Sequence, residues 1–413
     1  MTYKHFLLFL FIYHLKMVAI AQTNPNTSAK NISNQNITYH EALDDFYIIS
    51  LDKAVSHYKK TLTETPRQGE IPRALNADGS LHKVLSKDWT SGFYPGILWF
   101  LYEYSNDEQF KKAAKAWTAL IEDQKFNGVT HDMGFKIYNS YGNGFRLTKN
   151  KEYEDIIIQS SKTLITRFKS KAGIIRSWDH NKDKYACPVI IDNMMNLELL
   201  FKTSQLTNDP IFEKIAISHA DKTLKNHFRK DNSSYHVVDY DTLKGKVIRK
   251  LTHQGYSNES AWARGQAWGL YGFTMSFRET RDKKYLKQAI KIADYILNHP
   301  RLPEDFVPYW DFDAPNIPNE PRDASAASIM ASALLELSQY VAVDLKKNYL
   351  SSSKKILKSL SSENYFTTPN KYFLLNQSTG NIPSNSEINV PIIYADYYYL
   401  EALLRYKKLM DKS

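Results

Sequence analysis

The sequence contains a single cysteine, Cys187, among its 413 residues. One thiol cannot form an internal disulfide, so a disulfide scaffold is excluded, and so is a zinc site built from several thiolates. Two glycine motifs are also missing, because the sequence has neither a phosphate-binding glycine-rich loop nor a Gly-x-Ser-x-Gly nucleophile elbow. Its longest apolar stretch, near the N-terminus, is shorter than the roughly 20 residues that a membrane-spanning helix requires. These absences exclude a multispan membrane protein and the common nucleotide-binding loops.

Charged and aromatic residues are abundant. The 54 Lys and Arg against 44 Asp and Glu give a net charge of +10, and the 43 % hydrophobic content is typical of a soluble globular protein. Such a charge suits an acidic glycan, an anionic membrane or nucleic acid. The lysines are scattered rather than arranged in a stripe with aromatic residues between them, which does not favour nucleic acid. The 28 Tyr, 20 Phe and 7 Trp are enough either to line a sugar-binding cleft or to fill a large core.

The N-terminus is typical of an exported protein. Lys4 supplies a positive start, an apolar run follows, and small residues precede a cleavage position near Ala21. We therefore predict a signal peptide over 1–21, a polar disordered linker over 22–39 and a periplasmic or secreted domain over 40–413, without membrane insertion. The alternative for the first segment is a buried N-terminal helix. Cleavage removes two lysines and lowers the net charge from +10 to +8.

The body of the chain is predicted to be helical. Apolar residues recur at helical spacing over 113–120, 156–168, 194–206, 215–227, 261–277, 285–297, 327–341 and 397–409. Loops rich in Gly, Asp, Asn and Trp are predicted over 87–96, 130–144, 176–192, 252–266 and 308–323. Strand-like alternation is best over 234–239 and 246–251, with a turn between them. One large all-α domain follows, as a helical bundle, a solenoid or a closed toroid of helix pairs; the lack of a fixed repeat disfavours an ordinary repeat array.

Two carboxylates lie in segments that suit acid–base chemistry. Asp132 lies between a His and a Met-Gly pair, and Asp192 follows an apolar run at a predicted helix start. Apolar surroundings would raise the pKa of Asp192 and let it hold a proton near neutral pH. The alternative is that Asp192 caps the helix by accepting backbone N–H bonds. Two positioned carboxylates are what hydrolysis of a glycosidic bond requires.

The densest cluster of polar and aromatic residues lies between 252 and 268. Arg264 and Trp268 are four residues apart and share one face if this segment is a helix. Such a pair suits a sugar ring that carries a carboxylate, because the guanidinium binds the anion and the indole stacks on the ring. The alternative is a structural ion pair of Arg264 beside a core Trp. Trp89 precedes a glycine and suits either a cleft wall or the core, and His236 taken alone is more often structural.

Several of these segments together resemble glycoside hydrolase family 88, the unsaturated glucuronyl hydrolases. The matching stretches occur in the family's order and are DWTSGFYPGILW (88–99), THDMGF (130–135), VIIDNMMNLELL (189–200), SSYHVVDYD (233–241), THQGYSNESAWARGQAWGLYGF (252–273), YWDFDAP (309–315) and YADYYYLEALLRY (394–406). Each stretch alone is a weak signal, whereas the ordered set is specific.

The resemblance implies an (α/α)6 barrel with its site in a pocket at one end, and no cofactor or metal. The implied reaction releases the 4,5-unsaturated uronic acid from the non-reducing end of an oligosaccharide that a polysaccharide lyase has produced. In the family, an Asp protonates the ring double bond, water adds at the adjacent carbon, and the resulting hemiketal rearranges so that the glycosidic bond is lost. By motif, Asp192 is that acid and Asp132 the second carboxylate. The side chains implied to contact the sugar are Trp89, Trp178, His236, Gln254, Arg264 and Trp268.

The identity of the parent polysaccharide stays open. Some members bind a sulfate through serines near the C-terminal motif, and the corresponding segment 385–391 does not match them. Products of heparin, ulvan or unsulfated chains therefore remain possible. The alternatives are an unsaturated rhamnogalacturonyl hydrolase of the same fold, a uronate polysaccharide lyase on a related helical toroid, and a glycan-binding protein without catalysis. The sequence does not indicate an oligomeric state.

Overall fold

The computed structural model describes residues 45–64, 69–366 and 372–412. Residues Tyr47–Ser413 form one compact unit, distinct from Met1–Phe46. The predicted signal peptide, the predicted linker and the first residues of the predicted domain lie outside the described residues. In the described ranges, no helix has the length and apolar character needed to cross a membrane.

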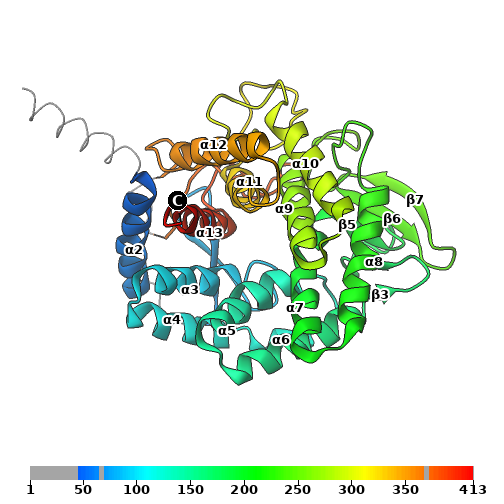
Figure 1. Cartoon of the computed structure of the whole chain (residues 1–413), viewed down its shortest axis with the longest axis horizontal. Helices are drawn as coiled ribbons and strands as arrows, with labels where there is room; N and C mark the ends of the chain where they lie inside the picture. The colour runs from blue at the N-terminus through cyan, green and yellow to red at the C-terminus, as the bar shows by residue number, and fades with distance from the viewer. Residues whose placement is uncertain (1–44, 65–68, 367–371, 413) are drawn as a thin grey trace, which may run out of the picture. The chain divides into compact units, whose positions relative to one another are not determined.

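Outer and inner helices alternate along the chain within this unit (Figure 1). The outer helices expose one side to solvent and are α2 (Phe46–Glu64), α4 (Glu108–Ala119), α6 (Lys151–Ile165), α8 (Pro210–Asn226), α10 (Lys283–Leu297) and α12 (Val343–Leu360). The inner helices are buried over much of their surface and are α3 (Phe93–Ser105), η2 with α5 (Gly134–Gly142 and Asn143–Thr148), η3 with α7 (Ile191–Asn196 and Leu197–Thr207), α9 (Ala263–Thr280), α11 (Ala324–Leu337) and α13 (Ile393–Met410). Each inner helix packs against the next, and α13 packs against α3. The ring is thereby closed, which confirms the predicted all-α class and (α/α)6 barrel.

Short strands extend the loops on the side of the inner helices' N-terminal ends. The pairs are β1 (Ile71–Leu75) with β2 (Leu81–Val84), β3 (Phe168–Lys169) with β4 (Ile174–Ile175), and a three-stranded antiparallel sheet of β5 (Pro188–Ile190), β6 (Val237–Asp241) and β7 (Lys246–Leu251). The predicted hairpin is confirmed, with β7 at its predicted bounds and β6 beginning three residues later than predicted. β3, β4 and β5 are too short to show an alternating pattern in the sequence, and β1 and β2 were not predicted.

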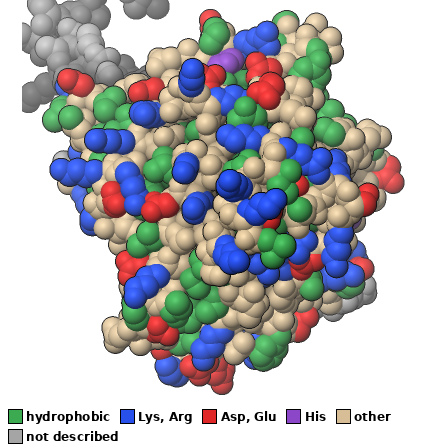
Figure 2. Space-filling view, turned by 90° about the vertical axis from the view of Figure 1, so that its right-hand side faces the viewer, with side chains coloured by type: hydrophobic (Ala, Val, Ile, Leu, Met, Phe, Trp, Pro, Cys, Tyr) green, Lys and Arg blue, Asp and Glu red, His purple; other side chains and the backbone are tan. Residues whose placement is uncertain are grey.

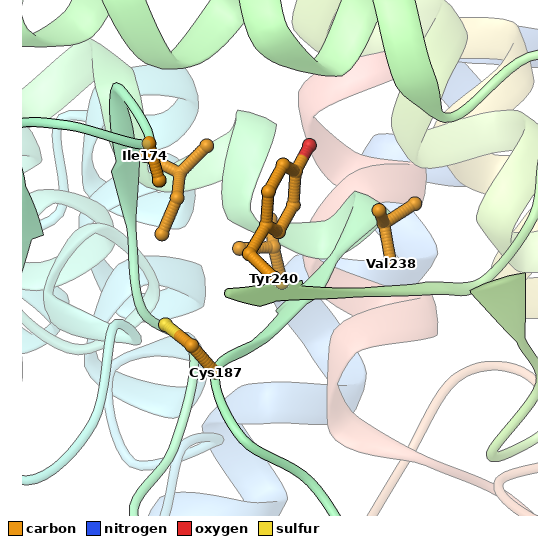
Figure 3. Packing of buried hydrophobic residues seen from close by; sticks show 6 residues of the cluster. Ile174, Cys187, Val238 and Tyr240 are labelled. Carbon is orange, nitrogen blue, oxygen red and sulfur yellow. The ribbon is translucent and has the colours of Figure 1, made fainter. Parts of the chain in front are cut away.

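One face of the three-stranded sheet covers a small hydrophobic core. Figure 3 shows Cys187, Val238 and Tyr240 packed together with Ile174. Burial raises the pKa of the Cys187 thiol to about 11, so the only cysteine is an uncharged packing residue. This core supports β5, and β5 leads directly into η3.

The predicted loop over 130–144 is wrong for most of its length. Residues Gly134–Gly142 form a π-helix, and α5 continues from it. The segment reads as a loop because its glycines and polar residues hide the helical spacing, yet Phe135, Ile137 and Tyr141 are buried among the neighbouring helices. Packing against those helices therefore overrides the low local propensity. π-Helical segments within longer helices are often found beside functional sites.

Four aromatic rings close the axis of the inner ring, and we call them the aromatic layer. Phe93 contacts Phe135 at 5.5 Å between ring centroids, and Phe135 contacts Trp268 at 5.2 Å. Trp268 contacts Tyr398 at 5.3 Å, and Tyr398 contacts Phe93 at 6.0 Å, so the four rings form a closed circuit. Each ring belongs to the first turns of its inner helix. The aromatic layer therefore forms a floor beneath the N-terminal ends of these helices.

A cavity of about 240 Å³ lies farther along the inner helices, toward their C-terminal ends. Polar side chains in its wall bind one another. Tyr271 donates a hydrogen bond to Glu401 at 3.0 Å, and Arg405 donates one to the Tyr271 hydroxyl at 2.8 Å. The cavity is thus separated from the predicted site residues, which precede or begin the inner helices.

A charged network ties the inner helices together at the level of this cavity. Arg278 in α9 binds the carboxylates of Glu198 in α7 and Glu336 in α11, the latter at 3.0 Å. Arg405 in α13 also binds Glu336, at 2.9 Å. Four inner helices are therefore linked through two arginines. Removing one partner of a buried ion pair leaves an uncompensated charge, which destabilises a protein strongly.

We expect Arg278→Met to lower the free energy of unfolding by about 2–4 kcal/mol, because Glu198 would lose its ion-pair partner and Glu336 would keep only Arg405. The lower part of the usual range applies, since the Arg278 side chain is 25 % exposed. Urea denaturation measures the effect. The matched control Lys287→Met changes an exposed cation of α10, and we expect it to alter stability little. Equal midpoints for the two variants would contradict a structural role for the network.

Candidate active site

The two predicted catalytic carboxylates and Arg264 lie at the N-terminal ends of inner helices. Asp132 shortly precedes η2, Asp192 is the second residue of η3, and Arg264 is the second residue of α9. Asp323 caps α11 from the same end of the barrel. Unpaired N–H groups at helix N-termini produce a positive potential. The site is therefore suited to a ligand that carries an anionic group.

A close contact between η2 and η3 places the two carboxylates together. A Cβ added to Gly134 would lie 2.6 Å from Asn196 Cα, so only glycine permits this approach. The N–H of Phe135 donates to Asn196 Oδ1 at 3.1 Å, and the Asn196 amide lies 3.5 Å from the Asp192 carbonyl oxygen. We call this arrangement the Gly134–Asn196 contact. It joins the segment after Asp132 to the segment after Asp192.

Asp192 has the environment of a proton donor. The residue is only 8 % exposed, and its Oδ2 has no hydrogen-bond partner among the residues that the structure describes. No side chain caps η3, so the alternative that Asp192 is a helix cap is wrong. Burial raises the pKa of Asp192 to about 6, and the charge of Asp132 acts in the same direction. His131 and Arg264 oppose this rise without cancelling it.

Asp132 is held in the ionised form. The Thr130 hydroxyl donates to Asp132 Oδ2, and His131 Nε2 lies 3.1 Å from Oδ1. Burial pushes the pKa of Asp132 upward, but His131, Thr130 and the nearby Lys136 outweigh it and hold the pKa below its usual range. Asp192 thus favours its protonated form and Asp132 its ionised form. Two carboxylates whose pKa values are pushed apart in this way can share acid and base roles.

His236 is neutral and its ring is fixed. Its Nδ1 accepts hydrogen bonds from the backbone N–H groups of His253 and Gln254, at 3.2 and 3.0 Å. The proton therefore lies on Nε2, which is 3.7 Å from Asp192 Oδ2. Burial lowers the pKa of His236 well below its usual value, and His253 and Arg264 add to the effect. The ring stacks on Trp262 at 4.5 Å and so presents a fixed N–H donor beside the acid.

Aromatic and amide side chains lie around these groups. Trp178 forms a β-bridge with Thr130 and contacts the His253 ring at 5.5 Å. Gln254 donates a hydrogen bond to the carbonyl oxygen of Gly380 at 3.1 Å. Trp89 is half-buried on Phe135 of the aromatic layer, at 5.4 Å. The contact of Trp89, Trp178, Gln254 and His236 with a sugar stays a prediction.

Arg264 and Trp268 lie deeper than the other predicted residues. The Arg264 guanidinium donates to Asp323 at 2.7 Å and to the carbonyl oxygens of Thr379 and Gly380 at 2.5 and 2.6 Å. Trp268 is fully buried in the aromatic layer. The arrangement matches the alternative of a structural ion pair beside a core Trp. A direct contact of either side chain with a sugar carboxylate or ring stays a prediction.

Three residues near the carboxylates were missed in the sequence. His131 adjoins Asp132, and this adjacency was the available signal. Lys136 is fully buried, donates to Gln124 at 3.0 Å and has a pKa lowered by burial to about 8. No signal could have found Lys136, because its segment reads as a loop. His253 lies directly before the predicted Gln254 but was not singled out.

Three side chains thus lie in one site: Asp192 with a carboxyl group that favours its proton, Asp132 as an ionised carboxylate, and His236 as a fixed neutral N–H donor. Among residues 45–64, 69–366 and 372–412, no group of three or more His, Cys, Asp or Glu is arranged to hold a metal ion. The predicted independence from metals and cofactors stays a prediction. Residues of this kind can protonate a double bond or a leaving group and then activate a water molecule.

Comparisons with known proteins agree on one family. Residues 68–407 match the family described as Glycosyl Hydrolase Family 88. The chain is 50 % identical over 361 residues to the unsaturated glucuronyl hydrolase of Formosa agariphila, covering 86 % of this chain and 90 % of the relative. It is 32 % identical over 367 residues to the unsaturated chondroitin disaccharide hydrolase of Streptococcus agalactiae serotype III, covering 87 % of this chain and 91 % of the relative. A crystal structure of an unsaturated glucuronyl hydrolase specific for heparin superimposes with a TM-score of 0.86 at 48 % identity, covering 89 % of this chain and 98 % of that one.

We expect Gly134→Ala to reduce both stability and activity, because the new methyl group would force η2 and η3 apart. Overpacking of this kind costs about 1–3 kcal/mol, and a displaced carboxylate pair would lower kcat/KM by about 10²-fold. Urea denaturation and turnover measure the two effects. The matched control is Gly128→Ala, whose added Cβ would meet nothing closer than 3.9 Å. Wild-type activity in the Gly134 variant would contradict the importance of the Gly134–Asn196 contact.

We expect Asp192→Asn to stabilise the protein at high pH. The folded-state pKa of Asp192, about 6, lies above the ordinary value of 3.8, so the wild type loses stability as the pH rises from about 4 to beyond 6. The amide has no charge to bury and avoids this loss, which amounts to about 3 kcal/mol. Urea denaturation of both proteins at pH 4.5 and pH 8 measures the difference. A difference that does not grow with pH would contradict the raised pKa.

Proposed function

The chain belongs to glycosyl hydrolase family 88 and is an unsaturated glucuronyl hydrolase, and from this we propose that Asp192 is its proton donor and Asp132 its ionised partner. The proposal applies the family chemistry to the two carboxylates of this chain. Its support is one observation above all, the buried and unpartnered Oδ2 of Asp192 beside an ionised carboxylate. A carboxyl group that keeps its proton near pH 6 can act as an acid at working pH.

The proposed reaction begins at the double bond between C4 and C5 of the uronate ring. This bond is an enol ether, because C5 also carries the ring oxygen. Asp192 gives its proton to C4, and the positive charge that develops is shared by C5 and the ring oxygen. The negative charge of Asp132 stabilises this state electrostatically. The fixed Nε2–H of His236 is placed to orient the Asp192 carboxyl group.

Water then adds at C5, and the Asp192 carboxylate accepts the proton that water loses. Asp192 is thereby returned to its protonated form. The hemiketal at C5 opens to a ketone and leaves a hemiacetal at C1, which releases the remaining sugar as an alcohol. Every proton that Asp192 gives is recovered in the same cycle. A single carboxyl group can therefore act as acid and then as base, provided that it begins protonated.

We propose products of glycosaminoglycan- or ulvan-type lyases as substrates. The Streptococcus agalactiae relative is named for a chondroitin disaccharide, and the similar solved structure is described as specific for heparin. An anionic sugar suits the helix N-termini and the net positive charge. An unsaturated rhamnogalacturonyl hydrolase remains the alternative that keeps the same chemistry. We also propose a periplasmic or secreted location after cleavage near Ala21.

We expect the enzyme to remove the ultraviolet absorbance of lyase-generated unsaturated disaccharides. Its kcat/KM should fall about tenfold per pH unit above pH 6, because deprotonation of Asp192 removes the acid. Asp192→Asn should lower kcat by about 10²–10⁴-fold while the protein stays folded. A panel of chondroitin, heparin, ulvan and rhamnogalacturonan disaccharides identifies the sugar.

The control is Asp209→Asn, which changes an exposed helix cap of α8 to another good capping residue. This variant should keep wild-type turnover. Substantial turnover by Asp192→Asn would place the acid elsewhere. A gain in absorbance in place of a loss would indicate a lyase.

A further inference from the structure

One side of the barrel carries an excess of cationic side chains beside the site. We call this surface the basic face, and it consists of the β3–β4 turn, the loop 181–186 and the β6–β7 hairpin. Its exposed or half-buried cations are Lys169, Lys171, Lys182, Lys184, Lys244, Lys246, Arg249 and Lys250. Figure 2 shows this side of the molecule, where Lys and Arg side chains spread across the middle of the view and outnumber the carboxylates.

The basic face is one continuous surface. The β6–β7 turn touches the β3–β4 turn, since a Cβ on Gly245 would lie 2.3 Å from the carbonyl oxygen of Lys171. Farther along β7, the Arg249 guanidinium donates a hydrogen bond to the carbonyl oxygen of Lys184. The core of Figure 3 lies beneath these segments and holds them in place. The segments that carry the cations are therefore held together by contacts to their backbones.

Carboxylates neutralise only part of this charge. The ion pairs of the hairpin join Arg249 to Asp239 at 3.4 Å and Lys244 to Asp241 at 3.9 Å. In the described chain, Lys171, Lys184 and Lys246 form no ion pair. Unpaired cations on a fixed surface attract polyanions, and the attraction weakens as salt screens it.

The basic face begins at the site. Lys184 precedes Tyr185, whose ring contacts Trp178 at 5.6 Å. The charge of Lys184 also helps to lower the pKa of His253, after burial as the main cause. From there β7 runs outward from Leu251 to Lys246, a length of about 17 Å. The surface is thus continuous with the site and extends well beyond the reach of one sugar.

We propose that the basic face binds the anionic remainder of a longer unsaturated oligosaccharide while its terminal uronate occupies the site. The inference rests on the proposed function, because it needs an anionic substrate that enters by its non-reducing end. A polymer that yields an unsaturated uronate carries further uronates along its chain, so its charges recur beyond the terminal sugar. A basic surface also suits nucleic acid, but its continuity with the site favours the glycan.

The test compares two triple variants that lower the net charge equally. The first is Lys171→Gln, Lys184→Gln and Lys246→Gln on the basic face. The matched control is Lys53→Gln, Lys112→Gln and Lys115→Gln, three exposed lysines on the outer helices α2 and α4. Each set is made in the Asp192→Asn background for binding and in the active enzyme for turnover. The probes are unsaturated heparin di- and hexasaccharides, and a single-stranded oligonucleotide of similar charge.

We expect the basic-face variant to bind the hexasaccharide about tenfold more weakly at low salt, with little difference from wild type at 1 M salt. The ratio of kcat/KM for the hexasaccharide to that for the disaccharide should fall by the same factor. The control variant should keep the wild-type ratio. Equal losses in both variants, or a wild type without preference for the hexasaccharide, would overturn the proposal, as would tighter binding of the oligonucleotide.

Failure of the proposed function gives a different result. If no unsaturated disaccharide loses its absorbance, the assignment of Asp192 fails, whatever the basic face binds. If disaccharides are consumed but chain length has no effect, only the role of the basic face fails.

Discussion

The Gly134–Asn196 contact is the constraint on which the site depends. Asp132 and Asp192 are far apart in the sequence and belong to neighbouring inner helices. Their coupling requires that η2 and η3 approach more closely than a side chain on Gly134 would allow. The Asn196 side chain then binds the backbone of both segments. A barrel of helices supplies many such interfaces, but this one carries a carboxylate on each side.

Burial then makes the two carboxylates different. Asp192 follows β5, which the sheet and its small core hold in an apolar environment, and its Oδ2 lies 3.7 Å from Nε2 of the neutral His236. Asp132 has a hydroxyl, an imidazole and a buried lysine near it. Burial therefore raises the pKa of Asp192, whereas at Asp132 the neighbouring groups outweigh it. The burial that raises the pKa of Asp192 also lowers the stability of the folded protein above that pKa. Such a loss of stability is common at active sites.

The pattern of apolar residues in the sequence predicted many of the helices, whereas the closed barrel was predicted from the family resemblance. Amphipathic outer helices such as α10 repeat their apolar residues clearly, and 285–297 was predicted nearly to its bounds. Among the inner helices, the periodic pattern predicted most of α9, whereas the first residues of α3 and all of η2 fell in predicted loops. Family motifs located Asp132 and Asp192, whereas the role of Gly134 depends on a neighbour 62 residues away. The periodicity of apolar residues does not reveal such a contact between distant segments. It also does not reveal that the charge of Lys136 acts on Asp132.

Arg264 shows how a cation can lie near an acid without ionising it. A free guanidinium would pair with Asp192 and hold its pKa low. Here Asp323 and two carbonyl oxygens bind the guanidinium N–H groups, and the rings of Trp262 and Tyr394 pack against it at 4.6 and 5.3 Å. Its pull on Asp192 is therefore smaller than the effect of burial, and the pKa stays near 6. The raised pKa of Asp192 therefore depends in part on an ion pair between Arg264 and Asp323 that contains neither Asp132 nor Asp192.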